Sequence, residues 1–154
     1  MKNIFVKTLL SSLLVGTLDI LAAFLHYYVS TGKNPSIILP YIASGVFGKD
    51  AFNDSNTMFI LGLMLHFFIA ICFTFFFFLV YSFLRRILKS NIIIAIIYAV
   101  FIWLVMQIIV IPLSRISQPQ ITFIGALQAI GILALCIGLP LSIIAFKTKK
   151  LVFL

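Results

Sequence analysis

Four long apolar stretches constrain this chain more than any other feature of its sequence. A helix needs about 20 apolar residues to cross the hydrocarbon core of a bilayer, and four segments reach that length. Backbone groups inside lipid must be hydrogen-bonded within their own segment, as they are in a helix. The sequence therefore predicts an all-α, four-helix transmembrane bundle with spans at approximately residues 7–29, 58–83, 91–113 and 121–146.

The composition leads to the same class of protein. Of the 154 residues, 64% are hydrophobic and 9% are charged, whereas about a quarter of a soluble domain is charged. Lipid must therefore be the solvent for much of the chain, and its length suits a single domain over residues 1–154. Cys72 and Cys136 each lie alone within an apolar stretch, so we expect two small buried hydrophobes and no metal site.

Basic residues are distributed unevenly among the connections. Three lie in the first and third connections, and eight lie at the two ends of the chain and in the second connection: Lys2, Lys7, Arg85, Arg86, Lys89, Lys147, Lys149 and Lys150. The positive-inside rule then predicts that both termini are cytoplasmic and that residues 30–57 lie outside. The net charge of +8 suits anionic lipid headgroups, and without a polar basic segment it does not indicate nucleic acid.

The first connection carries the signals of a short helix. Asn34 is a suitable N-cap and Pro35 suits the first helical position. We predict a helix over approximately residues 35–44, kinked or delayed by Pro40 and stopped at Gly45. Its apolar face predicts that it lies on the outer leaflet and covers the outer mouth of the bundle.

Ionisable groups inside a bilayer are costly and by default indicate function. Counted from the outer end of each span at 1.5 Å per residue, the depth is about 15 Å for Asp19, 12 Å for His66, 10 Å for Gln107 and Gln128, and 5 Å for His26. Polar groups of four helices in the same half of the membrane predict an outward-facing polar pocket. Hydrogen bonding that only fixes helix packing is the competing interpretation, above all for the two glutamines.

Asp19 and His66 form the predicted centre of this pocket. They lie on consecutive antiparallel helices, which are usually neighbours, and an isolated ionised carboxylate at that depth is strongly disfavoured. We therefore predict that the two side chains are direct or water-bridged partners that share one proton.

These polar residues do not form a pattern typical of an enzyme active site or a cofactor site. Two histidines could ligate haem, but the depths of His26 and His66 differ by about 7 Å, which disfavours it. Ser12 lies about two helical turns from Asp19, too far for a nucleophile beside its base. We expect no catalytic residue, no metal and no cofactor.

Three segments carry a resemblance to a known group of proteins: Gly16-Thr17-Leu18-Asp19, Tyr41-Ile42-Ala43-Ser44-Gly45-Val46-Phe47-Gly48 and His66-Phe67-Phe68-Ile69-Ala70. They resemble a family of small uncharacterised four-helix bacterial inner-membrane proteins. The resemblance runs over most of the chain and is strongest in its first half. It implies a bacterial cytoplasmic membrane and this topology, but no reaction and no role for any residue.

The function predicted from the sequence is a membrane protein that binds or transports a ligand through the outward-facing pocket. A structural or accessory subunit without a ligand is the main alternative. A small proton-coupled exporter that uses Asp19 is another, although no inverted repeat or half-helix is visible. The sequence leaves open whether a second copy of the chain or another membrane protein is its partner.

Overall fold

The computed structural model describes residues 2–53, 55–116 and 121–152, and no strand occurs among them. The helical elements are, in chain order, α1 (Lys2–Thr31), η1 (Pro35–Ile37), α2 (Ile38–Phe47), η2 (Gly48–Phe52), α3 (Ser55–Ile87), α4 (Asn91–Val105), η3 (Met106–Val110), α5 (Ile111–Leu113), α6 (Phe123–Leu133), η4 (Ala134–Gly138) and α7 (Leu139–Val152). Elements η1 and η2 are 3₁₀ helices, whereas η3 and η4 are π-helical.

The described chain contains four helices that are long and apolar enough to cross a membrane. Two are the single helices α1 and α3, and two are the unbroken runs α4–η3–α5 and α6–η4–α7. The candidate spans are Phe5–Thr31, Asn56–Ile87, Asn91–Leu113 and Phe123–Lys147. The all-α bundle and its four long apolar helices are thus confirmed, and the largest difference is at the end of the second, predicted at residue 83 and found at Ile87.

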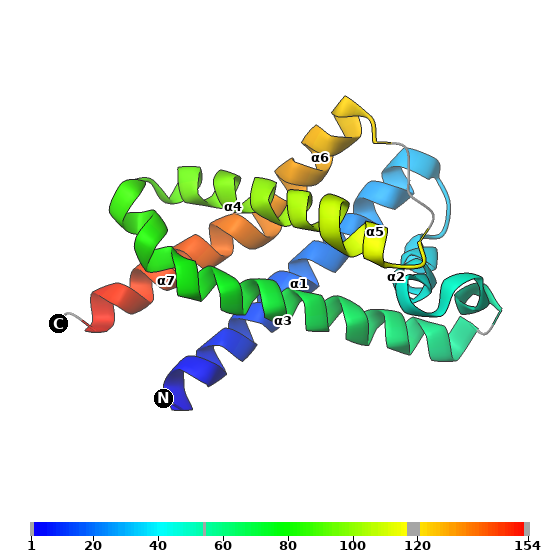
Figure 1. Ribbon diagram of the computed structural model, residues 1–154, viewed down its shortest axis with the longest axis horizontal. Coiled ribbons are helices and arrows are strands. Elements are labelled where there is room, and N and C mark those ends of the chain that lie inside the picture. Colours follow the sequence, from blue (N-terminus) through cyan, green and yellow to red (C-terminus); the bar gives the residue numbers. More distant parts are fainter. Residues whose placement is uncertain (1, 54, 117–120, 153–154) are drawn as a thin grey trace.

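The ends of the helices fall into two groups (Figure 1). The N-terminus, the C-terminus and the connection between α3 and α4 lie at one end of the molecule, and α2 and α5 lie toward the other. The three regions that carry most of the lysines and arginines therefore share one end, as their distribution in the sequence predicts.

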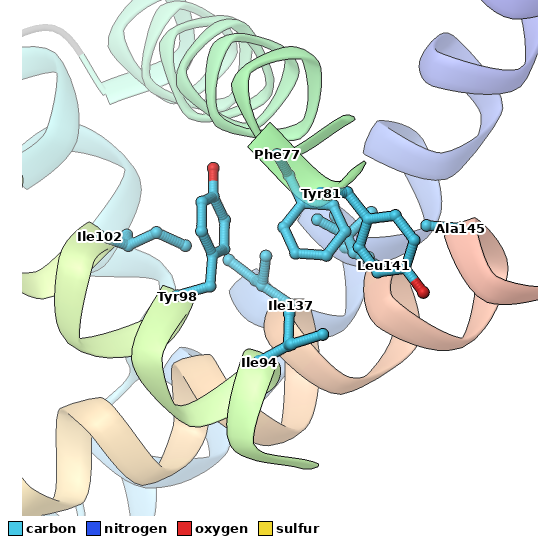
Figure 2. Close-up of a cluster of buried hydrophobic side chains, with 9 residues drawn as sticks. Phe77, Tyr81, Ile94, Tyr98, Ile102, Ile137, Leu141 and Ala145 are labelled. Carbon is cyan, nitrogen blue, oxygen red and sulfur yellow. The ribbon is translucent and has the colours of Figure 1, made fainter. Parts of the chain in front are cut away.

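The hydrophobic core lies between α1, α3, α4 and the run η4–α7 (Figure 2). Phe77 and Tyr98 meet edge to face, with ring centroids 4.8 Å apart, and the Tyr98 hydroxyl donates a 2.5 Å hydrogen bond to the Phe73 carbonyl. That bond satisfies a polar atom that burial would otherwise leave unpaired. The buried members of the cluster are Val15, Phe77, Tyr81, Ile94, Tyr98, Ile102, Ile137, Leu141 and Ala145.

A glycine sets the closest approach of the third and fourth long helices. A Cβ atom on Gly138 of η4 would lie 2.4 Å from the carbonyl oxygen of Ala95 and 2.9 Å from its Cα. Small residues at such a crossing let two backbones come into direct contact. The helices can therefore touch here only because residue 138 has no side chain.

The first connection folds as predicted at its start and differently at its end. Asn34 accepts a 3.0 Å hydrogen bond from the Ser36 backbone N–H, and Pro35 follows at the first helical position. The α-helical part begins late, at Ile38. The predicted stop at Gly45 is wrong, because α2 continues to Phe47. The residue that follows, Gly48, caps the helix with a φ of +66°, a conformation that favours glycine.

Candidate functional site

A cavity of about 300 Å³ lies between α2 and the four long helices. This volume is at the lower end of the range for small-molecule sites. The residues around it are predominantly apolar, and the described residues that line it are Asp19, Tyr41, Ile42, Gly45, Val46, Leu65, His66, Ile69, Ala70, Phe73, Ile102, Met106, Val110, Ile111, Ser114, Ile116, Leu133 and Ile137.

Helix α2 closes one side of the cavity through two backbone contacts. A Cβ atom on Gly62 of α3 would lie only 2.0 Å from the carbonyl oxygen of Leu39, so α2 rests directly on the backbone of α3. On the other side, the Arg115 backbone N–H donates a 2.9 Å hydrogen bond to the Gly45 carbonyl. Tyr41, Ile42 and Val46 of α2 face the cavity as a result.

The two π-helical segments contribute Met106, Val110 and Ile137 to the wall of the cavity. Each precedes a proline, because η3 ends two residues before Pro112 and η4 ends two residues before Pro140. A proline cannot donate a backbone hydrogen bond, and its ring clashes with the carbonyl four residues earlier. Local π-helical turns are one way in which membrane helices accommodate this change, and such turns are frequent at functional sites.

Asp19 is the acidic group of the cavity. Its side chain is partly buried on α1 and lines the cavity together with His66 of α3. The carboxyl group acts electrostatically on His66 and on Cys136 of η4, so both lie within its field. Among the described residues, no lysine or arginine lines the cavity. Asp19 therefore has only the imidazole as a candidate for a positive neighbour there.

His66 is held by α1. Its Nε2 atom lies 2.8 Å from the carbonyl oxygen of Gly16, and because a carbonyl oxygen can only accept, Nε2 carries a proton and donates it. Gly16 permits this bond by packing closely on α3: a Cβ atom there would lie 3.0 Å from the Phe67 ring and 3.2 Å from Ala70. In neutral His66 the remaining nitrogen, Nδ1, is a free hydrogen-bond acceptor.

The structure brings Asp19 and His66 to one cavity, and their predicted partnership stays a prediction. The two side chains line one cavity and interact electrostatically. However, the hydrogen bond that the structure shows for the imidazole goes to the Gly16 carbonyl, not to the carboxylate. A water-bridged contact between Asp19 and His66 stays a prediction.

The other three predicted site residues lie apart from this pair. His26 of α1 and Gln128 of α6 are both exposed, and their side chains approach each other to 3.4 Å, from Nε2 to Oε1. Gln107 is partly buried within η3 and is not among the described residues that line the cavity. Of the five predicted polar groups, Asp19 and His66 therefore line the cavity and the other three do not. Equal depth does not fix the direction in which each helix turns a side chain.

Several residues of the cavity were missed by the sequence reasoning. Met106, Val110 and Ile137 reach it from the π-helical segments, and Ser114 and Ile116 reach it from the segment after α5. Pro112 and Pro140 were visible inside apolar stretches and could have indicated the irregular turns. No comparable signal marks the segment after α5.

The residues that line the cavity define the chemistry available there. Among the described residues, no group of three or more histidine, cysteine or acidic side chains could hold a metal ion. Ser114 lines the cavity, and its hydroxyl donates a 2.7 Å hydrogen bond to the Ile111 carbonyl and accepts one of 3.2 Å from the Ile116 backbone N–H. The cavity is an apolar enclosure that contains the Asp19 carboxyl group and the His66 imidazole. Such an enclosure can bind an apolar molecule, and the carboxyl group can hold or release a proton.

Comparison of the chain with protein-family models, curated proteins and solved structures finds no match in any of the three. The resemblance to a family of small inner-membrane proteins gains no support from this result. The functional conclusions below therefore rest on the cavity and its residues alone.

Proposed function

We propose that this chain is a multi-pass protein of a bacterial inner membrane that binds or moves a small, mainly apolar ligand through the cavity. The observation that carries the proposal is the placing of Asp19 and His66 in a predominantly apolar cavity beneath α2. A carboxyl group in such surroundings is costly to maintain, and helix packing alone does not require one.

The surface of the molecule supports insertion in lipid. Large apolar side chains point outward on every long helix, with exposures of 65% for Leu25, 62% for Phe68, 67% for Ile108 and 69% for Leu135. A soluble monomer rarely exposes such extended apolar surface. We propose that α2 lies at the outer interface, where it separates the cavity from water.

The proposed topology has a direct test. In a variant without Cys72 and Cys136, a cysteine introduced at Lys49 should react in intact cells with a maleimide that cannot cross the membrane. A cysteine introduced at Lys89 should react only after the membrane is opened, because the basic connection stays in the cytoplasm. The reverse pattern of labelling would overturn the orientation.

The proposed function is tested by identifying the small molecules that stay bound to the purified protein. Ile69 of α3 lines the cavity, so Ile69→Trp should fill it. Ile60, on the same helix, is 64% exposed, which makes Ile60→Trp a matched control that leaves the cavity unchanged. Mass spectrometry of the small molecules released from each protein should find a compound with the wild type and Ile60→Trp that is depleted by about tenfold or more with Ile69→Trp, as steric exclusion from a site requires.

Identical sets of bound molecules in all three proteins would contradict a ligand site in the cavity. That result would favour the alternative function, a structural or accessory subunit in which Asp19 and His66 serve only to fix the helices.

A further inference from the structure

The charged and titratable groups around the cavity define what it can attract. Asp19 comes from α1, Tyr41 from α2 and His66 from α3, and Cys136 of η4 lies within the field of the carboxyl group. The wall formed by α4 and η3 adds only apolar side chains there: Ile102, Met106 and Val110. No lysine or arginine is among the described lining residues, so none of them carries a permanent positive charge that would favour an anion.

One basic residue, Arg115, lies in the chain between two residues that line the cavity, Ser114 and Ile116. Arg115 follows α5, and its side chain lies along Gly48, with Cδ 3.6 Å from the place of a Cβ atom there. Its backbone N–H is bound to the Gly45 carbonyl. Arg115 is not among the described residues that line the cavity.

One proton suffices to make the empty site neutral. An ionised Asp19 carboxyl is costly in the apolar surroundings of the cavity, and binding one proton removes its charge. When a cation enters, it can take over the stabilisation of the carboxylate, and the proton is then no longer required.

We propose that the cavity binds an amphipathic organic ammonium ion in exchange for one proton. This inference rests on the proposed function and names the chemical class of its ligand. The ammonium group donates hydrogen bonds to the Asp19 carboxylate, and the apolar part of the ligand contacts residues such as Ile69 and Ile102. No covalent bond forms; one positive charge enters and one proton leaves, so the net charge of the site is unchanged.

Two probes of nearly identical shape test the charge preference. 4-Phenylbutylamine carries an ammonium group at pH 7, and 4-phenylbutanol carries a neutral hydroxyl in its place. Binding to the protein in lipid nanodiscs, corrected for empty nanodiscs, should be tighter for the amine by about tenfold or more, because hydrogen bonds to a charged partner are the stronger kind. In Asp19→Asn the preference for the amine over the alcohol should vanish, because the variant has no carboxylate to pair with the ammonium group.

The proton provides a readout that needs no variant. Calorimetry of amine binding to the wild-type protein in buffers of different ionisation enthalpy should show release of about one proton per amine bound, since linked protonation adds the buffer's heat to the observed heat. The alcohol should release none. 4-Phenylbutyrate, the anion of similar shape, should bind more weakly than either.

The outcomes separate this inference from the proposed function. Equal binding of amine and alcohol, amine binding without proton release, or an unchanged preference in Asp19→Asn would overturn the ammonium exchange while leaving a ligand site in place. Absence of binding by both probes would overturn the exchange as well. If, in addition, Ile69→Trp and the wild type carry the same bound molecules, both the ammonium exchange and the proposed function are contradicted.

Discussion

Gly138→Ala is expected to destabilise the bundle by about 1–3 kcal/mol or more, the usual cost of overpacking a filled contact. The added methyl group would lie 2.4 Å from the Ala95 carbonyl oxygen and 3.0 Å from its carbonyl carbon. These are backbone atoms, so no side chain can rotate away, and α4 must move from η4. This displacement would also weaken the packing of the core cluster, to which α4 contributes Tyr98 and η4 contributes Ile137.

A second glycine in the fourth long helix serves as the matched control. A Cβ atom on Gly131 of α6 would meet no heavy atom within 4 Å. Gly131→Ala should therefore leave stability unchanged or raise it by up to about 1 kcal/mol through helix propensity. Equilibrium unfolding in mixed micelles measures both variants, and equal midpoints for them would contradict the close contact of α4 and η4.

Gly62→Ala is expected to lift α2 from α3 and open the cavity. The new methyl group would lie 2.0 Å from the Leu39 carbonyl oxygen and 2.7 Å from its carbon, so the two backbones cannot keep their positions. The amides of α2 should then exchange their hydrogens about tenfold faster or more, as a local destabilisation above about 1.4 kcal/mol requires. The amides of α4 should change little, because α4 does not depend on this contact.

Hydrogen exchange followed by mass spectrometry gives this result peptide by peptide. Gly131→Ala is again the control, since it adds the same methyl group in open space. Unchanged exchange in α2 would show that α2 does not rest on Gly62. If α2 is released, the wild-type set of bound small molecules should be depleted in Gly62→Ala as it is in Ile69→Trp.

The four long helices and the helix of the first connection could be predicted because their signals are strong and local. About 20 apolar residues in a row fix a span by length alone, and Asn34-Pro35 marks a helix start through one cap and one fixed φ angle. Both signals act within a single segment. They therefore do not depend on how the segments pack.

The rotation of each helix about its own axis could not be predicted in the same way. In a chain of this kind, apolar side chains suit both lipid and the interior, so hydrophobic periodicity does not tell the two faces apart. His26 shares a stripe with Asp19 on α1, yet it meets Gln128 of α6 while Asp19 lines the cavity. The estimated depth of a residue in the membrane carries no information about such pairings.

The shape of the cavity also depends on contacts between distant segments. The Gly62–Leu39 approach and the hydrogen bond from Arg115 to Gly45 set the place of α2, and neither has a signature in the sequence. The early end expected at Gly45 was wrong for a related reason: a glycine can continue a helix, and only the backbone geometry at Gly48 marks the true end.

Reaction of Asp19 with a small apolar carbodiimide tests most directly whether this carboxyl group faces a cavity that small apolar molecules can enter. N,N′-diisopropylcarbodiimide adds a protonated carboxyl group across its C=N bond, and the adduct rearranges to a stable N-acylurea that tandem mass spectrometry assigns to one residue. Asp19 should be modified in wild type and in Ile60→Trp, and several-fold more slowly in Ile69→Trp. An unmodified Asp19, or equal rates in the two tryptophan variants, would contradict the cavity as a site.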